Sequence, residues 1–253
     1  GADIFRFYMT HSTNIFGTFD WKENEAENVK AILGRIYFAL EETIKNAMKG
    51  KVENYYFHKF EKIKKEASRK IEEMNLRDYN RIVVFDVLNL INKAKVSLNK
   101  KELSAFYDYV AEDWIKMISP VMPHLAEELW SKLGRKGFVS LADWPSFDES
   151  KINEEFDKID LMIDKTVSDI NNIKKIVNID KPHVYLYTIP SDVTIYEDNK
   201  EMIKICSGAA VIQIQSTNDK NIYDPEGKSK KAKPGKPGIH IAGGDIIVKN
   251  INK

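Results

Sequence analysis

Residues 120–130 read PVMPHLAEELW, and this stretch decides the fold of the first half of the chain. Pro120 and Pro123 are incompatible with the interior of a regular helix, so they predict a bend followed by a new helix start. After the bend, leucines recur at helical spacing with Trp130 beside them, while two glutamates lie near the N-terminal end, where acidic side chains are favoured. The stretch therefore predicts a proline-bent helix that buries Trp130 in a helix bundle.

This motif closely resembles a signature of the α-helical anticodon-binding domain of class I aminoacyl-tRNA synthetases, in the subgroup that charges leucine, isoleucine, valine and methionine. Two further stretches resemble the same family. Residues 1–8 are similar to the segment that follows the KMSKS loop, and residues 19–21 are similar to the motif that leads into the first bundle helix. Residues 133–140 and 142–145 are similar to the end of this domain in leucyl-tRNA synthetases of the archaeal and eukaryotic type. The resemblance frames residues 1–145.

The hydrophobic pattern predicts two domains, in a fold that is mainly α: a helix bundle followed by a small α+β domain. The bundle covers residues 1–147, with a short connector at 1–22, and Trp144-Pro145 ends it because proline and the residue before it discourage helix. Apolar residues at helical spacing predict its main helices at residues 23–49, 53–74, 76–96 and 101–118.

The second predicted domain covers residues 148–253 and starts with a long amphipathic helix at 149–177. Strand-like runs follow at residues 183–189, 193–196, 209–215, 239–242 and 246–248. A short helix is predicted at 199–206, and the paired glycines in residues 242–245 predict a hairpin turn. This layout is similar to the C-terminal domain of archaeal-type leucyl-tRNA synthetases.

Composition favours a cytoplasmic protein that handles nucleic acid, without requiring one. The net charge is only +1, but lysines are concentrated in residues 43–70 and 220–253, and local basic surface attracts phosphate. The single cysteine excludes an internal disulfide and suits a reducing compartment. No apolar run is long enough to span a bilayer, so no membrane contact is expected.

The sequence offers no catalytic, cofactor-binding or metal-binding residues. It contains no HIGH-like or KMSKS-like signature and no Rossmann-type glycine fingerprint, and residues 225–229 lack the glycine spacing of a P-loop. The five histidines share no metal-ligand spacing, and we expect Cys206 to be a small buried residue. Glu127 and Glu128 are adjacent, so on a helix they point in different directions and make a poor acid/base pair.

Three groups of basic residues are candidates for RNA contact. The first lies in a Pro/Gly-rich loop at 227–238, expected to be flexible and exposed, and consists of Lys228, Lys230, Lys231, Lys233 and Lys236. The second, on the helix predicted at 53–74, consists of Lys59, Lys62, Lys64, Lys65, Arg69 and Lys70. The third surrounds an interhelical turn and consists of Lys93, Lys95, Lys100 and Lys101. Exposed lysines suit phosphate contacts and carry little base specificity. On composition alone, the loop can equally be a solvated linker and the helical groups solvated faces.

The resemblance implies the tRNA-binding C-terminal portion of a leucyl-tRNA synthetase, whose α+β domain contacts the long variable arm of tRNA(Leu). ATP and magnesium would then be bound by a catalytic domain of the same polypeptide before Gly1, and this chain alone would be inactive. Two alternatives stay open. One is the corresponding region of an isoleucyl or valyl enzyme, which reads the anticodon. The other is a helical scaffold or protein-interaction module that binds no RNA.

Overall fold

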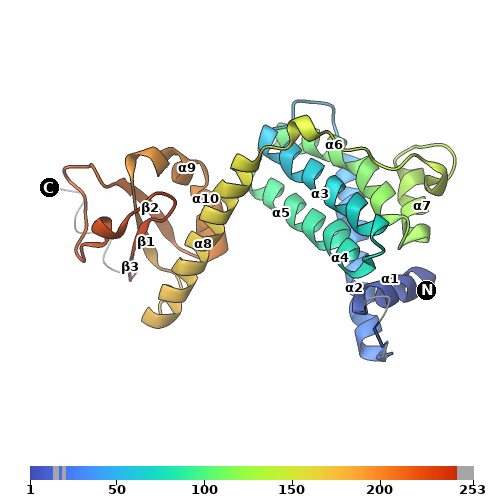
Figure 1. The fold of residues 1–253 in the computed structure, drawn as a ribbon, viewed down its shortest axis with the longest axis horizontal. Helices are drawn as coiled ribbons and strands as arrows, with labels where there is room; N and C mark the ends of the chain where they lie inside the picture. Colours follow the sequence, from blue (N-terminus) through green and yellow to red (C-terminus); the bar gives the residue numbers. More distant parts are fainter. Residues whose placement is uncertain (14–16, 19–20, 244–253) are drawn as a thin grey trace. The chain divides into compact units, whose positions relative to one another are not determined.

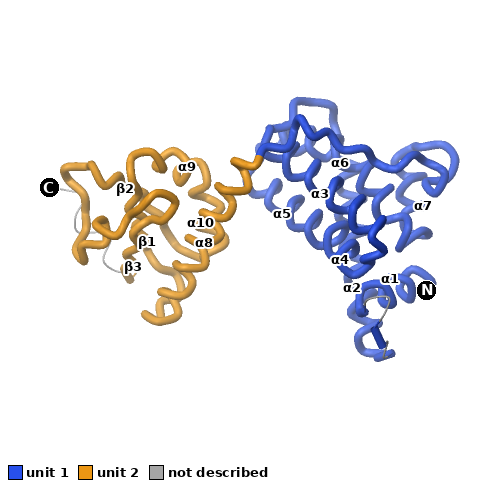
Figure 2. Tube along the Cα trace, in the orientation of Figure 1, with its two compact units in different colours: residues 1–153 blue, residues 154–253 orange. Residues whose placement is uncertain are grey.

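The computed structural model describes residues 1–13, 17–18 and 21–243, and the chain divides into an N-terminal unit of residues 1–153 and a C-terminal unit of residues 154–253 (Figure 2). Sequence pattern places the division earlier, after residue 147. The N-terminal unit extends further because residues 149–151 form a short 3-10 helix, η3 (Glu149–Lys151), that packs on helix α3 (Asn54–Glu72).

The N-terminal unit is a helix bundle, as predicted (Figure 1). Besides α3, it contains α1 (Ala2–Ser12), α2 (Glu23–Asn46), α4 (Leu76–Asn80), α5 (Val87–Ser97), α6 (Lys100–Ile118), α7 (Pro123–Lys132) and a 3-10 turn, η2 (Val139–Leu141). Ile36, Leu40 and Trp114 are fully buried at its centre, and burial of such side chains is the main favourable contribution to folding. Trp130 is only 6 % exposed, so its predicted burial is confirmed.

The proline bend is confirmed. Helix α6 ends at Ile118, and α7 begins with Pro123 in its first turn, where the missing N–H costs no hydrogen bond. The predicted connector at 1–22 contains α1, whose Phe7 and Tyr8 are buried in the bundle core.

The helix predicted at 76–96 is interrupted. A π-helical turn, η1 (Arg81–Asp86), separates α4 from α5, and π turns leave backbone carbonyls less regularly bonded. The indole N–H of Trp114 donates to the carbonyl of Val83 at 2.8 Å inside the core. A side chain from α6 therefore supports the irregular turn.

Within the described residues, the C-terminal unit packs helices on a three-stranded sheet. In chain order it contains α8 (Glu154–Val177), β1 (His183–Thr188), the 3-10 turn η4 (Pro190–Asp192), α9 (Val193–Asp198), α10 (Lys200–Ser207), β2 (Val211–Ser216), the 3-10 turn η5 (Lys228–Lys231) and β3 (Gly238–Ala242). The sheet order is β2-β1-β3, with β1 parallel to β2 and antiparallel to β3. Ile163 and Ile170 of α8 pack with Val184 and Leu186 of β1 to form the core of this unit.

Two predictions in this unit are wrong. Residues 193–196, predicted as a strand, belong to α9, because a parallel β1–β2 pair needs a crossover connection that leaves the sheet. Cys206, predicted to be buried, is exposed, since α10 turns Ile203 and Ser207 toward the core instead. The strand predicted at 246–248 and most of the turn predicted at 242–245 lie outside the described residues.

Candidate nucleic-acid interface

All five lysines of the first candidate group line one groove in the C-terminal unit. We call this site the lysine groove. Its lysines are Lys228, Lys230, Lys231, Lys233 and Lys236. The groove is also lined by Asp169, Asn172 and Ile173 of α8 and by Pro237, Gly238 and Ile239 at the start of β3. The groove has a volume of about 640 Å³, so the fold converts a run of lysines into a concave cationic site.

The segment that carries these lysines is folded, whereas composition predicts a flexible loop. Asp224 organises its start, because one carboxylate oxygen accepts from the N–H of Lys228 at 2.8 Å and the other from the N–H of Ser229 at 2.9 Å. Desolvation opposes the charged form of Asp224, but hydrogen bonds from Ser229, Lys228 and Gly227 outweigh it and lower the pKa of this carboxyl.

The end of the segment is held in the same way. The backbones of Lys233 and Lys236 exchange two hydrogen bonds of 2.9 Å, and the N–H of Gly235 donates to the buried carboxylate of Asp192 at 2.8 Å. Gly238 passes so close to the Lys228 carbonyl that a Cβ there would lie 2.1 Å from the oxygen, so only glycine fits. These contacts fix the backbone from which the lysines project.

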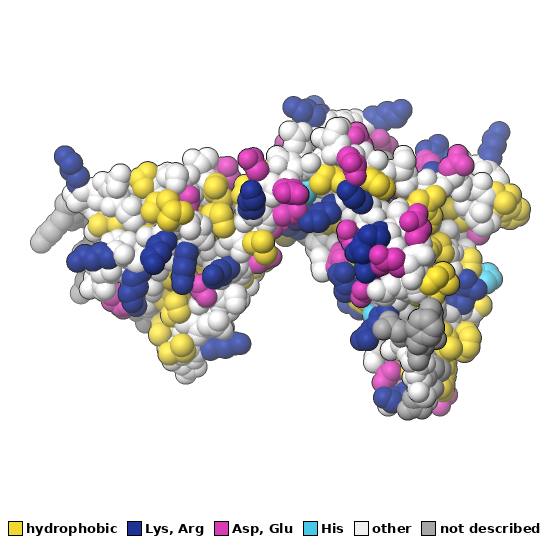
Figure 3. Space-filling model, viewed as in Figure 1, with side chains coloured by type: hydrophobic (Ala, Val, Ile, Leu, Met, Phe, Trp, Pro, Cys, Tyr) yellow, Lys and Arg dark blue, Asp and Glu magenta, His cyan; other side chains and the backbone are white. Residues whose placement is uncertain are grey.

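The lysine groove carries uncompensated charge. Lys228 pairs with Glu226 at 3.2 Å, but within the described residues no ion pair involves Lys230, Lys231, Lys233 or Lys236, all four of which are exposed. Figure 3 shows Lys and Arg side chains gathered on the face of the C-terminal unit that it draws. Exposed cations that converge on a concave surface attract polyanions such as the RNA backbone.

The second candidate group is largely neutralised. Lys64 is buried and pairs with Glu61 at 2.9 Å and with Asp113 at 3.1 Å, so it is unsuited to contact RNA. Lys65 pairs with Glu149 at 2.7 Å.

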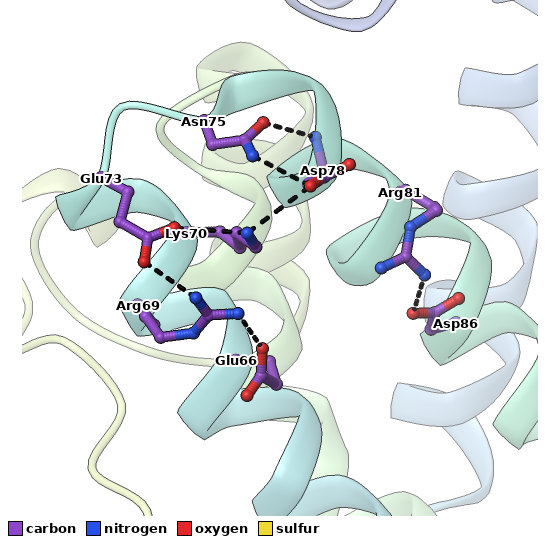
Figure 4. A network of polar contacts seen from close by, with 8 residues as sticks. All are labelled: Glu66, Arg69, Lys70, Glu73, Asn75, Asp78, Arg81 and Asp86. Atoms are coloured by element: carbon purple, nitrogen blue, oxygen red, sulfur yellow. Dashed lines mark hydrogen bonds and ion pairs between the residues drawn. The ribbon is translucent and has the colours of Figure 1, made fainter.

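Further along α3, Arg69 bridges Glu66 and Glu73, and Lys70 lies between Glu73 and Asp78 (Figure 4). Glu66 lies on α3, Glu73 directly follows that helix, and Asp78 lies on α4. Their proximity removes most of the positive potential that the lysine count suggests.

Two more lysines, one from the second group and one from the third, meet around one tyrosine. The Lys93 Nζ lies 4.4 Å from the centre of the Tyr55 ring and donates to its hydroxyl, and the Lys59 Nζ lies 5.8 Å from the same ring. Lys62 is exposed one turn after Lys59.

In the rest of the third group, Lys95 pairs with Glu42 at 2.6 Å, whereas Lys100 and Lys101 are exposed at the start of α6. The bundle therefore offers scattered cations, in contrast to the concentrated charge of the lysine groove.

The two glutamates of the quoted motif have structural partners. Glu127 accepts from the N–H groups of Val139 and Ser140 at 3.0 and 3.4 Å and so holds the η2 turn against α7. Glu128 accepts from the Tyr37 hydroxyl at 3.0 Å. In the described part of the chain, no group of three His, Cys, Asp or Glu side chains is placed to hold a metal ion.

Sequence reasoning missed the α8 wall of the lysine groove. Asp169, Asn172 and Ile173 lie three and four residues apart, the spacing that places side chains on one helix face. A polar pair inside an otherwise regular isoleucine pattern was the available signal, but nothing in the sequence shows that this face meets the lysines.

None of the described helices is long and apolar enough to cross a membrane.

Comparison with known proteins points to one family. A family model described as the anticodon-binding domain of tRNA ligase matches residues 53–186. The chain is 30% identical over 190 residues to a leucine–tRNA ligase of Staphylothermus marinus, covering 73% of this chain and 20% of the relative. It is 31% identical over 195 residues to a leucine–tRNA ligase of Methanocaldococcus jannaschii, covering 74% and 20%. The chain thus spans about a fifth of the length of these curated relatives.

A solved structure shares the fold. The match is to a chain in the ternary complex of LeuRS, tRNA and LeuAMS from Agrobacterium radiobacter K84, with a TM-score of 0.52 and 15% identity, covering 75% of this chain and 22% of that one.

Proposed function

The chain belongs to the family of anticodon-binding domains of tRNA ligases, and from that premise we propose that it is the tRNA-binding portion of a leucine–tRNA ligase. The parent enzyme would attach leucine to tRNA(Leu) using ATP. The leucine assignment is supported by the names of the relatives in two archaea. The cytoplasm stays the expected compartment.

The observation that carries the RNA proposal is the lysine groove. Four exposed lysines with no ion-pair partner among the described residues face one concave surface. Each phosphate contact by such a lysine releases condensed counterions, which favours binding at moderate salt. The backbone is held by Asp224 and Asp192, so RNA binding requires little ordering of the segment.

ATP and magnesium are assigned to the parent's catalytic domain. The described residues of this chain do not fit a magnesium–nucleotide site, because the groove presents cations with a single carboxylate, Asp169, and no three-ligand cluster occurs. The catalytic domain of the same polypeptide is therefore a proposed partner, alongside tRNA.

The proposed RNA partner is tRNA(Leu), with its long variable arm on the C-terminal unit. The test is fluorescence anisotropy with three transcripts: tRNA(Leu), the same tRNA with its variable arm shortened, and tRNA(Ile). We expect shortening the arm to weaken binding at least tenfold. Equal affinity for all three transcripts would contradict the leucine assignment. Preference for tRNA(Ile) would favour the isoleucyl alternative, and absence of binding would favour a protein-interaction scaffold.

A further inference from the structure

The lysine groove contains more than phosphate binding requires. A surface that only follows an RNA backbone needs cations, and a carboxylate there repels the phosphates. Yet Asp169 of α8 lines the same groove as the five lysines. Ile173, Pro237 and Ile239 add apolar surface to the same groove. The groove therefore combines a cationic wall, an apolar surface and polar side chains with hydrogen-bonding capacity.

The polar side chains of the α8 wall are available to a ligand. Asp169 and Asn172 are three residues apart on one face of α8. Within the part of the chain that the structure describes, neither side chain makes a hydrogen bond or an ion pair. Asp169 lines the same groove as five lysines without pairing with any of them, so it does not serve as a short-range counterion.

An unpaired nucleotide has the three complementary features: an anionic phosphate, an apolar ring face and a polar base edge. The groove volume of about 640 Å³ lies within the usual range for small-ligand sites. We infer that the lysine groove holds one unpaired nucleotide of an RNA and that Asp169 and Asn172 select its base. This inference rests on the proposed function, because it requires that the groove bind RNA.

The chemistry of Asp169 sets the expected preference. A carboxylate only accepts hydrogen bonds, so it favours bases that present amino groups, which cytosine, adenine and guanine have. Uracil offers one N–H between two carbonyl oxygens, and these oxygens oppose a carboxylate. The Asn172 side chain can both donate and accept hydrogen bonds, so it can strengthen binding of any base but does not decide which base is preferred. Uracil is therefore the base that the groove should bind least well.

The experiment uses the full chain and four stem-loop RNAs that differ only in one bulged nucleotide: C, A, G or U. Dissociation constants are measured at one salt concentration and the salt dependence is measured for each RNA. We expect the U-bulged RNA to bind roughly tenfold more weakly than the C-bulged RNA. Asp169→Asn, which can donate to the uracil carbonyls, should abolish or reverse this ratio, and Asn172→Ala should reduce it.

Asp164→Asn is the matched control, because Asp164 is an exposed acid of α8 outside the groove. It should leave the C-to-U ratio unchanged while tightening all four complexes slightly. If Asp169→Asn tightens all four complexes equally and keeps their ratio, base selection by Asp169 is wrong, although salt-dependent RNA binding would still support the proposed function. If the wild-type chain binds none of the four RNAs at low salt, the proposed function fails and this inference fails with it.

Discussion

The carboxylate of Asp3 accepts a hydrogen bond of 2.8 Å from the backbone N–H of Leu125, 122 residues away in the sequence. Its other oxygen lies 3.3 Å from the backbone nitrogen and 2.9 Å from the ring Nδ1 of His124. Asp3 thus occupies the N-terminal end of α7, where unpaired N–H groups favour an anion. Two of the three sequence stretches that resemble the synthetase family, residues 1–8 and 120–130, therefore meet at this point.

Asp3→Ala should destabilise the N-terminal unit by about 1–2 kcal/mol, as loss of a helix N-cap does. The free energy of unfolding can be measured by urea titration with tryptophan fluorescence, because all four tryptophans lie in residues 1–153. Asp3→Asn, which keeps one acceptor, should lose less. If Asp3→Ala behaved like Asp108→Ala, a change at an exposed position on α6, the cap would contribute nothing.

Trp130→Ala should cost roughly 3–5 kcal/mol, because it removes a large side chain that is only 6 % exposed in the core. Urea unfolding followed by far-UV circular dichroism gives the loss without depending on the deleted fluorophore. Trp144→Ala should lose less stability, since Trp144 is 38% exposed. A variant that unfolds like the wild type but no longer binds tRNA would make Trp130 a contact residue instead.

Lys64→Met should cost about 3–5 kcal/mol, because it leaves the buried Glu61 carboxylate without its cation. The neighbouring Lys65→Met is the control: that lysine is 46% exposed and pairs with an exposed Glu149, so its loss should stay below about 1 kcal/mol. Urea unfolding followed by tryptophan fluorescence gives the free energy of unfolding of both variants. Similar losses in the two variants would show that the buried pair contributes no more than a surface pair.

Asp224→Ala should destabilise the C-terminal unit by about 1–2 kcal/mol at neutral pH, since two backbone N–H groups lose their acceptor. Because folding lowers the pKa of Asp224, this contribution is present above its ordinary value of 3.8 and is lost as the pH falls through the lower folded value. Urea unfolding followed by far-UV circular dichroism at pH 7 and at pH 3 measures the difference in the free energy of unfolding between wild type and Asp224→Ala. A difference between wild type and variant that stays constant down to pH 3 would contradict the role of the ionised carboxylate. Asp198→Ala, at an exposed position, should show no such pH dependence.

The helices of the bundle were predictable because patterns within each helix's own sequence mark them. Apolar spacing marks α2, α3 and α6, and two prolines mark the bend before α7. The π turn was not predictable, since the N–H that bonds the Val83 carbonyl comes from Trp114 on another helix. The strand predicted at residues 193–196 is wrong for a similar reason. Their β-branched side chains favour a strand, but Tyr196 is buried, and its hydroxyl lies 3.2 Å from the Thr166 hydroxyl of α8, a contact that the helical turn of α9 allows.

For the candidate site, the sequence predicts the segment that carries the lysines but not the contacts that hold it. Clustered lysines among prolines and glycines identify the segment, because such residues stay at the surface. Sequence alone could not show that Asp224 and Asp192 hold that segment in place, or that Asp169 faces it. Nor could it separate Lys64 from its neighbours, since Asp113, which pairs with it, lies 49 residues further along the chain. Partners that are distant in the sequence therefore decide which cations stay exposed and unpaired.

The central claim is that the lysine groove contacts RNA phosphates, and the salt dependence of tRNA binding tests it most directly. Replacing Lys230, Lys231, Lys233 and Lys236 by alanine should leave the fold intact and lower the slope of log Kd against log salt concentration by about one for each contacting lysine. A control variant replaces four exposed lysines of the same unit outside the groove: Lys158, Lys165, Lys175 and Lys181. We predict that the groove variant loses most of the slope and the control variant little. An unchanged slope in the groove variant, or an equal decrease in both variants, would contradict the claim.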